Sequence, residues 1–493
     1  MKISMLTILS QFRRHILYKQ HHRASVVQMQ VREEIMLKLQ NTLYAKEHGI
    51  EFEKLPIVTY EDISKYIEQM VSGESNILSN EKITLFAKSS GTTNAKSKYL
   101  PTPRSYLKSN HYRGGKDMAA LYIASSHSTK FLAGKTLGIS GSLSLSPGHP
   151  DILCGDVSAL LVRELPWWAV SRRAFDLSIA LLPSWEEKML HIVSRAKEYD
   201  IRVIAGTPTW VSILLKNITL KEKVQYIEEV WPKLEVFFHG AVSFLPYKPI
   251  FEKLSKKLKY FEVYNASEGC IAVQNNLKKP GELLLLINHS IFYEFIPIKN
   301  FGDKNQKIYK LHEVEIGEVY VLVISTTSGL YRYVIGDTIR FTSLSPYCIT
   351  ITGRTKHFIN AFGEEIVVEN ANIAILQACK NTEAMVAHYT AGPVYMDDGL
   401  AGAHEWYIEY TTTPNNQEEF NKTLDETLRA INSDYDAKRI GDKVMKSPIV
   451  NVTPEGTFYE FMKIRGKLGG QHKVPPLSNN REYLEEIKKI IFK

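Results

Sequence analysis

Short, largely apolar segments that end in small residues alternate with helical patterns through the middle of the chain. They occupy residues 135–142, 201–208, 234–243 and 260–269, and a helical pattern fills residues 186–199. Strands that alternate with helices are typical of βαβ units, in which neighbouring strands run parallel. The sequence therefore predicts an open α/β sheet, and such sheets bind ligands at the carboxyl ends of their strands.

The pattern changes near residue 282, where one strand-like segment follows another with short links between them. These segments are residues 282–298, 317–326, 330–341 and 347–353. Consecutive strands without intervening helices indicate an antiparallel, barrel-like part of the fold.

The last part of the chain begins a new mixture of helical and strand patterns after Gly353. Its length suits an independent small domain. We therefore expect a large α/β domain at residues 1–354, with βαβ sheets and the barrel-like part, and a small α+β domain at residues 355–493.

Composition and charge exclude several classes of protein. Aromatic residues make up 11% of the 493 residues, which argues against a disordered chain. The formal net charge of +8 suits anionic small ligands, and without a dense basic stripe it does not indicate a nucleic-acid partner. The four cysteines are scattered and form no CxxC pair, so we expect neither a zinc site nor a disulfide framework.

The N-terminal segment is apolar at residues 3–9, but Ser4 and Thr7 interrupt it and Arg13 and Arg14 follow. A secretory signal has a longer unbroken apolar run. We therefore expect an amphipathic first helix with a basic face, no stable membrane insertion and a cytoplasmic protein. No run of 18 apolar residues occurs in the sequence, which predicts no transmembrane helix.

A loop of small and hydroxyl-bearing residues follows an apolar segment near residue 85. It consists of Ser89, Ser90, Gly91, Thr92 and Thr93. Backbone N–H groups beside glycine, together with the hydroxyls, could surround phosphate oxygens. The motif lacks the GxxxxGK[ST] spacing of a P-loop, so a plain solvated loop is the alternative. We expect Lys96 and Lys98, which follow the loop, to be solvated.

Three further motifs carry polar side chains that could bind a nucleotide. In VYNASEG, Tyr264 could stack on a base and Glu268 could hold Mg²⁺ against phosphates, because magnesium prefers oxygen ligands. Asp337 follows a glycine, and a carboxylate on a tight turn can accept both ribose hydroxyls. Arg354 is always charged and could reach a ribose or a phosphate. Taken singly, each motif is also typical of an exposed turn or loop.

In this order, the motifs resemble those of the Gretchen Hagen three family, the auxin-responsive acyl acid amido synthetases, and most of all its compact bacterial-type branch. The resemblance runs from about Val26 to the C-terminus. It is carried by SSGTTNAKSKYLP, VYNASEG, LYRYVIGDT, GRTKHFINAFGEE and GGQHKVPPLSN, among other segments. It implies an adenylate-forming architecture, a mobile C-terminal domain and a monomer.

The resemblance also implies a two-step reaction that uses ATP and Mg²⁺. A carboxylic acid first attacks the α-phosphate of ATP, which gives an acyl-adenylate and pyrophosphate. An amine, usually that of an amino acid, then attacks the carbonyl carbon and releases AMP, which leaves an amide. Two alternatives stay open: an acyl-CoA ligase that forms a thioester, and a non-catalytic protein that binds acids or nucleotides.

The same resemblance implies a role for individual residues. Residues 89–93 would hold the β- and γ-phosphates, and Glu268 would orient magnesium. Asp337 would bind the ribose, and Arg354 would lie at the hinge of the mobile domain. The positions that match contacts to the adenine and the α-phosphate are Gly240, Ala241, Tyr264, Asn265 and Ala266.

Lys473 matches the lysine that the mobile domain brings to the α-phosphate, and Lys467 is the second candidate. A compact ammonium group suits a phosphate on which charge shifts. The family pattern here is NKVPR, whereas this chain has His472 and Pro476 at the first and last positions. The arginine that is absent here could have contacted a phosphate or the C-terminal tail. Its replacement by Pro476 is the one sequence feature that favours the non-catalytic alternative.

The acyl pocket is expected in the large domain. His239 would meet the carboxylate of the acid, with Arg113 as the alternative. The candidates for its apolar walls, each of which could instead be a core residue, are Tyr112, Trp167, Trp168, Trp210 and Phe238. The sequence contains no Ser-His-Asp ordering and no HExxH motif, so hydrolase and zinc-protease functions are not indicated.

Overall fold

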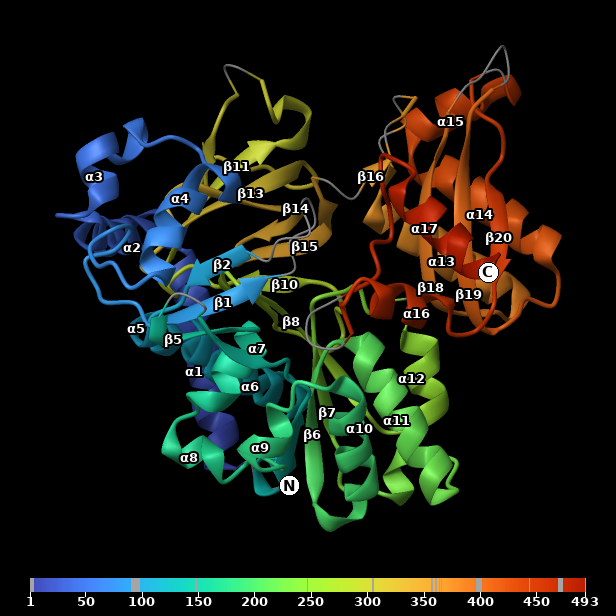
Figure 1. Ribbon diagram of the computed structural model, residues 1–493, viewed down its shortest axis with the longest axis horizontal. Coiled ribbons are helices and arrows are strands. Elements are labelled where there is room, and N and C mark those ends of the chain that lie inside the picture. The colour runs from blue at the N-terminus through green and yellow to red at the C-terminus, as the bar shows by residue number, and fades with distance from the viewer. Residues whose placement is uncertain are drawn as a thin grey trace. The chain divides into compact units, whose positions relative to one another are not determined.

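The structure, a computed structural model, describes the chain except residues 1–3, 90–97, 147–148, 246, 304–305, 356–357, 360, 363, 365, 396–400, 443, 469–472 and 493, and except the side chains of residues 89, 168 and 433. The chain folds into two compact units (Figure 1). Unit 1 comprises Met1–Ala241 and Ser255–Thr350, and unit 2 comprises Val242–Leu254 and Ile351–Lys493.

The main sheet of unit 1 joins a parallel part to an antiparallel part. Strands β3, β6, β7 and β8 are parallel, and β8 then pairs antiparallel with β9. Within the described residues the sheet has eleven strands. In spatial order these are β12 (Tyr309–Lys310), β11 (Ile291–Pro297), β13 (Val319–Thr326), β14 (Tyr333–Leu344), β15 (Tyr347–Arg354), β10 (Leu283–Leu285), β9 (Gly269–Gln274), β8 (Lys259–Ala266), β7 (Val236–His239), β6 (Ile201–Gly206) and β3 (Lys135–Gly138).

A smaller sheet and a set of helices complete unit 1. The sheet has the order β2 (Lys98–Pro101), β1 (Leu85–Ser89), β5 (His149–Gly155) and β4 (Leu143–Ser146). The helices are α1 (Met5–His21), α2 (Ala24–Leu39), α3 (Leu43–His48), α4 (Tyr60–Val71), α5 (Arg104–Tyr106), the π-helical segment η2 (Leu107–His111), α6 (Tyr112–Ser126), α7 (Val157–Arg163), α8 (Trp167–Val170), α9 (Leu177–Ala180), α10 (Trp185–Ser194) and α11 (Pro208–Glu222).

Local sequence explains where several of these helices begin. Pro208 opens α11, where its missing N–H is not needed. The side chain of Ser184 caps α10 by accepting a hydrogen bond from the backbone N–H of Glu187. In Figure 1 both helices lie on the same side of β6 and β7.

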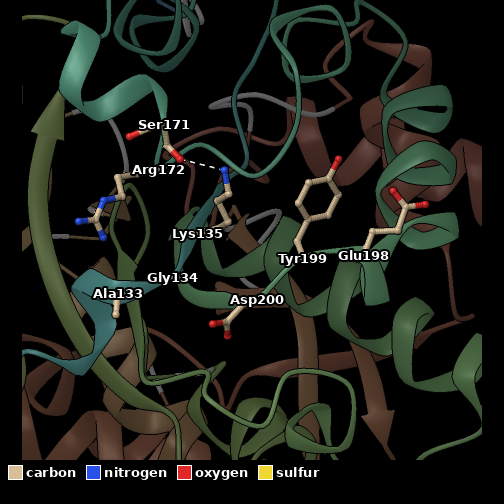
Figure 2. A pocket seen from close by; sticks show the side chains of 8 residues that line it. All are labelled: Ala133, Gly134, Lys135, Ser171, Arg172, Glu198, Tyr199 and Asp200. Atoms are coloured by element: carbon tan, nitrogen blue, oxygen red, sulfur yellow. Dashed lines mark hydrogen bonds between the residues drawn. The ribbon is translucent and has the colours of Figure 1, made fainter.

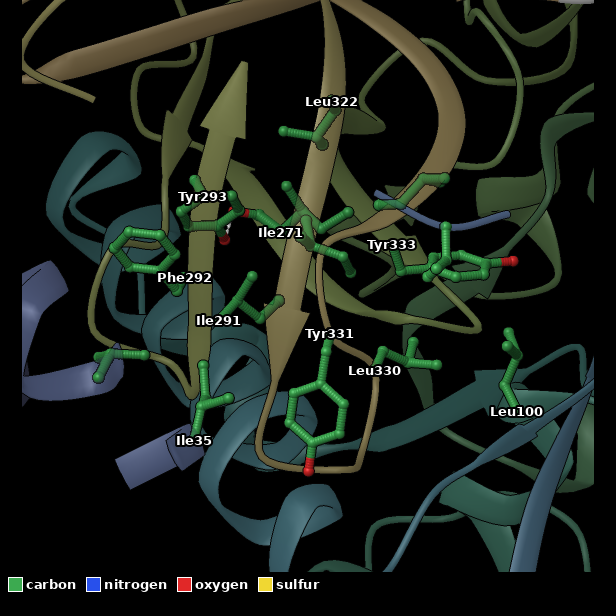
Figure 3. Close-up of a cluster of buried hydrophobic side chains, with 14 of the residues drawn as sticks. Ile35, Leu100, Ile271, Ile291, Phe292, Tyr293, Leu322, Leu330, Tyr331 and Tyr333 are labelled. Carbon is green, nitrogen blue, oxygen red and sulfur yellow. Dashed lines mark hydrogen bonds between the residues drawn. The ribbon is translucent and has the colours of Figure 1, made fainter. Parts of the chain in front are cut away.

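Two apolar cores hold the two parts of the main sheet. The parallel strands pack against α1 and α6 through Leu17, Leu121, Phe238 and Phe261. The antiparallel strands enclose a larger core, to which α2 adds Ile35 (Figure 3). Phe238, a candidate wall of the acyl pocket, is therefore a core residue.

Unit 2 is a three-stranded sheet of the described residues with helices around it. Its strands are β18 (Met385–Val394), β19 (Ala403–Thr412) and β20 (Ile449–Thr453), and a small hairpin of β16 (Phe358–Ile359) and β17 (Ile366–Val367) precedes them. Its helices are α12 (Lys248–Leu254), α13 (Val368–Thr382), α14 (Gln417–Ile431), α15 (Ser433–Arg439), α16 (Thr457–Ile464) and α17 (Glu482–Ile491).

The observed architecture confirms the predicted fold class, because parallel strands with helices lead into an antiparallel part and a smaller α+β unit follows. The expected domain ranges, 1–354 and 355–493, stay a prediction. The compact units differ from them in placing Val242–Leu254 with the later part of the chain. None of the described helices has the length and apolar character needed to cross a membrane.

Candidate active site

The carboxyl ends of β7 and β8 lie side by side. His239, the last residue of β7, is opposite Glu262 in the parallel register, and Gly240 follows directly. A Cβ atom on Gly240 would lie 2.2 Å from the backbone oxygen of Val263, so only glycine lets the chain leave β7 this close to β8. Ala241 then adopts the left-handed region with φ of 71°. The predicted pair Gly240 and Ala241 thus forms a tight crossing at the sheet edge where α/β proteins bind ligands.

The VYNASEG motif forms the hairpin between β8 and β9, and side chains from η2 and α5 hold it. Tyr106 donates a hydrogen bond from its hydroxyl to the backbone oxygen of Glu268 at 2.7 Å. The side-chain oxygen of Asn110 accepts from the backbone N–H of Cys270 at 2.7 Å, and its amide nitrogen donates to the carbonyl of the same residue at 3.2 Å. The hairpin that carries Glu268 is therefore fixed by residues from a different part of the chain.

His111 connects the same π-helical segment to the predicted residue Asn265. Its Nδ1 lies 2.9 Å from the side-chain oxygen of Asn265. Burial lowers the pKa of His111 to about 4, so the ring is neutral near pH 7 and donates from Nδ1. Its Nε2 has no hydrogen-bond partner within the described part of the chain. A π-helical turn is frequent at functional sites, and here it aims Asn110 and His111 at the hairpin.

Tyr264 and Asp337, which lie far apart in the sequence, meet in the structure. The hydroxyl of Tyr264 donates to Oδ2 of Asp337 at 2.5 Å. Asp337 does not lie on a hairpin turn, as the Gly-Asp pair suggested, but within β14 after Gly336, which has φ of 90°. The pairing of β13 with β14 shifts register at this point. A bulge of this kind re-aims a side chain, which explains how a strand residue reaches Tyr264.

Two carboxyl groups lie near the carboxyl end of β8. Glu268 is 9% exposed, in the turn that Tyr106 and Asn110 hold. Glu262 lies two residues before Tyr264 on the same strand, so both side chains point to one face of β8. Burial raises the pKa of Glu262 to about 7. Sequence reasoning missed Glu262, although its alternation with Tyr264 at the end of a predicted strand was a usable signal.

The two residues predicted to bind the carboxylate of the acid substrate, His239 and Arg113, lie in different surroundings. His239 is buried and its pKa is lowered to about 3 by burial, so its imidazole is neutral. Arg113 lies on α6, where burial lowers its pKa and its charged neighbours are Arg13, Asp117 and Glu34. Those neighbours belong to α1, α6 and α2 rather than to β7 or β8.

The aromatic candidates for the acyl pocket divide into buried and exposed side chains. Trp210 is buried on α11 and packs edge-on against Trp185, with ring centres 4.7 Å apart. Trp167 on α8 is 87% exposed. The hydroxyl of Tyr112 donates to the backbone oxygen of Leu161 at 3.1 Å. The roles of these residues, and of His239 and Arg113, stay predictions.

Most of the predicted phosphate loop lies outside the described residues. This applies to Ser90, Gly91, Thr92 and Thr93, and to Lys96. Ser89 ends β1 and pairs with Lys98 of β2, so the two strands fix the positions where the loop begins and ends. Nζ of Lys98 lies 3.6 Å from a carboxylate oxygen of Glu61 and 5.0 Å from the ring centre of Tyr60.

Unit 2 carries the remaining predicted residues. Arg354 is the last residue of β15, and Lys473 is half-buried in the segment before α17. That segment runs beside β18, because the backbone oxygen of Pro476 accepts a hydrogen bond from the backbone N–H of Ala391 at 3.0 Å. The proline that departs from the family pattern therefore has a defined backbone contact. His472 lies outside the described residues.

A cavity of 330 Å³ opens at the other end of the parallel strands (Figure 2). It lies where β3 and β6 begin, and Lys135 at its wall donates to the backbone oxygen of Ser171 at 2.8 Å. None of the predicted site residues lines it. Because α/β sheets bind ligands at the opposite end of their strands, this cavity is not the candidate active site.

Comparison with protein families gives one consistent result along the chain. Residues 13–260 match the GH3 family N-terminal domain, residues 284–354 its central domain and residues 369–482 its C-terminal domain. Two similar curated proteins are the indole-3-acetic acid-amido synthetases GH3.4 and GH3.3 of Arabidopsis thaliana. Each is 25% identical to this chain, over 91% of this chain and 88% of the relative.

Solved structures share the fold. The acyl acid amido synthetase AtGH3.15, solved in complex with 2,4-DB, has a TM-score of 0.80 at 18% identity, covering 100% of this chain and 98% of that one. A 2-hydroxyisobutyryl-CoA ligase has a TM-score of 0.61 at 12% identity, covering 96% of this chain and 92% of that one. At these identities the likeness concerns the fold, which is that of adenylate-forming enzymes.

Proposed function

The chain belongs to the GH3 family of acyl acid amido synthetases, which are adenylating ligases, and we propose that it joins a carboxylic acid to an amino acid with ATP as the activating substrate. In the first step a carboxylate oxygen bonds to the α-phosphorus and the bond to pyrophosphate breaks. In the second step the amine nitrogen bonds to the acyl carbon, a proton leaves that nitrogen, and AMP departs.

The contact between Tyr264 and Asp337 is the observation that carries this proposal. It joins the residue expected to pack on the adenine to the residue expected to bind the ribose, from two strands far apart in the sequence. At Gly240 the backbone passes close to Val263 of β8, the strand that carries Tyr264. We propose that the nucleoside lies along this edge, with Tyr264 against the base and Asp337 accepting the ribose hydroxyls.

Glu268 is the residue that would hold Mg²⁺. The described residues contain no cluster of three or more metal-ligating side chains. Magnesium commonly uses one or two carboxylates together with substrate phosphates, so a single carboxylate at a fixed turn fits its chemistry. When bound, the ion would neutralise phosphate charge. The hydrogen bonds from Tyr106 and Asn110 to this hairpin would keep the Glu268 carboxylate in place.

Residues 89–93 and Lys473 would act on the phosphates. The strands β1 and β2 fix the ends of the loop, whose hydroxyls and backbone N–H groups would hold the β- and γ-phosphates as pyrophosphate leaves. Lys473 would stabilise charge on the α-phosphate in the first step. We propose that unit 2, with Arg354 near the start of its second segment, moves between the two steps so that the amine can replace pyrophosphate at one site.

The acid is expected to be apolar apart from its carboxylate. The curated relatives are described as acting on indole-3-acetic acid, and an identity of 25% does not fix the acid for this chain. Because the imidazole of His239 is neutral, it would donate a hydrogen bond to the carboxylate rather than supply a charge. Arg113 and Trp210 stay candidates for the same pocket.

An acyl-CoA ligase is the second candidate function. The fold likeness to a 2-hydroxyisobutyryl-CoA ligase fits a shared first step, in which an acid is adenylated. The two functions differ in the acceptor, since the ligase would form a thioester with coenzyme A. A non-catalytic binder is the third possibility. The backbone oxygen of Pro476 accepts a hydrogen bond that any residue at this position could accept, so the contact does not explain the substitution, and Lys473 is retained.

Several finer expectations form part of the proposal. They are dependence on Mg²⁺, a cytoplasmic location, a monomeric state and membership of the compact bacterial-type branch of the family. The curated relatives named above are plant proteins, so the branch rests on the sequence motifs alone.

Pyrophosphate release tests the proposal. The protein is incubated with Mg-ATP and pooled aromatic and aliphatic carboxylic acids, with and without pooled amino acids or coenzyme A. The same assay is run on Glu268→Gln and Lys473→Ala, with Lys467→Ala as the matched control for a lysine in the same segment.

We expect release that depends on an acid, rises with amino acids but not with coenzyme A, and falls at least about 100-fold in Glu268→Gln and Lys473→Ala. A rise with coenzyme A alone would support the ligase instead. If nucleotide binds but no acid elicits release, the non-catalytic alternative is favoured. If pyrophosphate release falls as far in Lys467→Ala as in Lys473→Ala, the assignment of Lys473 to the α-phosphate is overturned.

A further inference from the structure

The first helix, α1, exposes its apolar residues and buries polar ones. Met5, Ile8, Leu9 and Phe12 are 74%, 59%, 51% and 62% exposed, and their spacing of three and four residues places them on one face. The face that points inward carries buried Thr7, Ser10, Leu17 and His21. An amphipathic helix on a protein core has the opposite arrangement.

Polar contacts with α6 fix this orientation. The side-chain amide of Gln11 donates to the backbone oxygen of Ala124 at 2.7 Å. Arg13 donates two hydrogen bonds to the buried carboxylate of Asp117, at 2.6 and 2.8 Å. Rotation of α1 to bury its apolar face would break these bonds and leave the buried carboxylate of Asp117 without its guanidinium partner. The exposed apolar residues are therefore a surface that the fold presents.

Positive charge continues the same surface. Lys19 lies seven residues after Phe12, so it prolongs the outward face of α1, and it is exposed. Arg23 follows the helix and is also exposed. The first 32 residues of the sequence contain no aspartate or glutamate. The outward face is thus apolar in its first two turns and cationic after them.

We propose that α1 docks this protein reversibly on an anionic membrane surface. Bulky apolar side chains would enter the boundary between head groups and acyl chains, while Lys19 and Arg23 meet lipid phosphates. Seventeen residues with Arg13 and Arg14 among them suit a helix that lies on a membrane and does not span one.

Charge complementarity favours this occupant over a second copy of the chain. A symmetric pair of α1 helices would bring two cationic faces without acidic residues together, whereas anionic lipid neutralises them. An acidic protein with an apolar groove would share part of this chemistry. The docking proposal does not depend on the proposed enzymatic function.

Co-sedimentation with vesicles tests the proposal on the full chain. The vesicles are phosphatidylcholine alone, or phosphatidylcholine with phosphatidylglycerol, at low and at high salt. The test variant is Ile8→Ser with Phe12→Ser. The matched control is Leu190→Ser with Leu220→Ser, which removes two leucines that are 69% and 66% exposed on α10 and α11. Lys19→Glu tests the charge.

We expect binding to the anionic vesicles that weakens at high salt, at least about tenfold loss in the α1 double variant, and no loss in the control. Lys19→Glu should weaken binding to the anionic vesicles only. Equal loss in the control, or unchanged binding of the α1 variant, would overturn the proposal. A dimer that dissociates in the α1 variant, without vesicle binding, would assign the face to a second copy. Absence of both vesicle binding and self-association would refute the proposal, with a different protein as the remaining candidate for the α1 face.

Discussion

Gly240 shows how a single residue controls the shape of the candidate site. The chain leaves β7 so close to Val263 that a Cβ atom would lie 2.2 Å from its backbone oxygen. We predict that Gly240→Ala lowers the free energy of unfolding by about 2 kcal/mol or more, because backbone must move to make room. Gly138→Ala is the control, since Gly138 also ends a parallel strand but has no atom within 4 Å of an added Cβ. Denaturant unfolding measures both, and similar values for the two variants would contradict the account.

The carboxyl group of Glu262 titrates near neutral pH in the folded protein. Burial raises the pKa of its carboxyl group from 4.5 to about 7, so the folded protein holds this proton more tightly than the unfolded chain. The stability that it contributes is complete below about pH 4.5 and is lost as the pH rises through 7. Glutamine cannot ionise.

We therefore predict that Glu262→Gln gains about 2 kcal/mol of stability relative to the natural chain between pH 5 and pH 8, after allowance for the partial exposure of the side chain. Denaturant unfolding of both proteins across this pH range measures the difference. A constant difference would show that Glu262 titrates in its ordinary range.

Residues of the site differ in how far the sequence could predict them. Tyr264 and Asp337 stood in motifs, and the structure brings them into contact. Asn110 and His111 begin the segment NHYRGGKDMAALY, which carries part of the family resemblance, but the sequence assigned them no role. They reach the hairpin because a π-helical segment lies against it, which is a tertiary effect. Glu262 gains its raised pKa from burial, which depends on the packing around the strand rather than on its neighbours in sequence.

At the scale of elements, a buried polar cluster ties α1 and α6 to the segment between β10 and β11. The carboxylate of Asp117 accepts two hydrogen bonds from Arg13 and lies 2.9 Å from Nε2 of His289. Burial opposes ionisation of Asp117, but the hydrogen bonds from His289 and Arg13 outweigh it and lower its pKa. Stability from this group is therefore present at neutral pH and lost as the pH falls below its ordinary value of 3.8.

We predict that Asp117→Ala lowers the free energy of unfolding by about 3 to 5 kcal/mol at pH 7, because Arg13 and His289 lose their partner. Amide hydrogen exchange should rise first in α1, which the cluster holds to α6. Gln30→Ala, at an exposed position of α2, is the control. Unchanged exchange in α1 would show that the cluster does not anchor the helix.

The order of elements was largely predictable, whereas their orientation was not. Alternation of strands and helices predicted the parallel strands, and the later run of strands predicted the antiparallel part. A first helix was expected, and α1 confirms it. Its outward apolar face was not predictable, because contacts with Ala124 and Asp117 on a distant helix decide it. The same holds for the bulge in β14, which turns Asp337 toward Tyr264.

At the scale of the whole molecule, the residues with predicted roles are divided between the two compact units. Tyr264, Asp337 and Glu268 belong to unit 1, and Lys473 belongs to unit 2. The segment Val242–Leu254 is part of unit 2 although it precedes β8 in the chain, and its Phe251 is fully buried. A cut between residues 354 and 355 therefore separates this segment from the rest of its unit.

We predict that a fragment of residues 1–354 is cleaved rapidly by protease within Val242–Leu254, while the full chain is protected there. The physical reason is the loss of contacts with the later residues of unit 2, where the rings of Tyr247 and His388 have centres 6.4 Å apart and Nζ of Lys253 donates to Oγ1 of Thr412 at 3.3 Å. Mass spectrometry of limited digests identifies the cleavage sites. Protection of this segment in the fragment would show that residues 1–354 fold as an independent domain.

The identity of the nucleotide product distinguishes attack at the α-phosphate from attack at the γ-phosphate. The protein is incubated with Mg-ATP, an acid that supports turnover and an amino acid, and the nucleotides are separated by chromatography. We predict AMP and pyrophosphate in amounts equal to that of the amide, because the carboxylate attacks the α-phosphate. Formation of ADP and inorganic phosphate with the same acid would contradict it, since that result requires attack at the γ-phosphate.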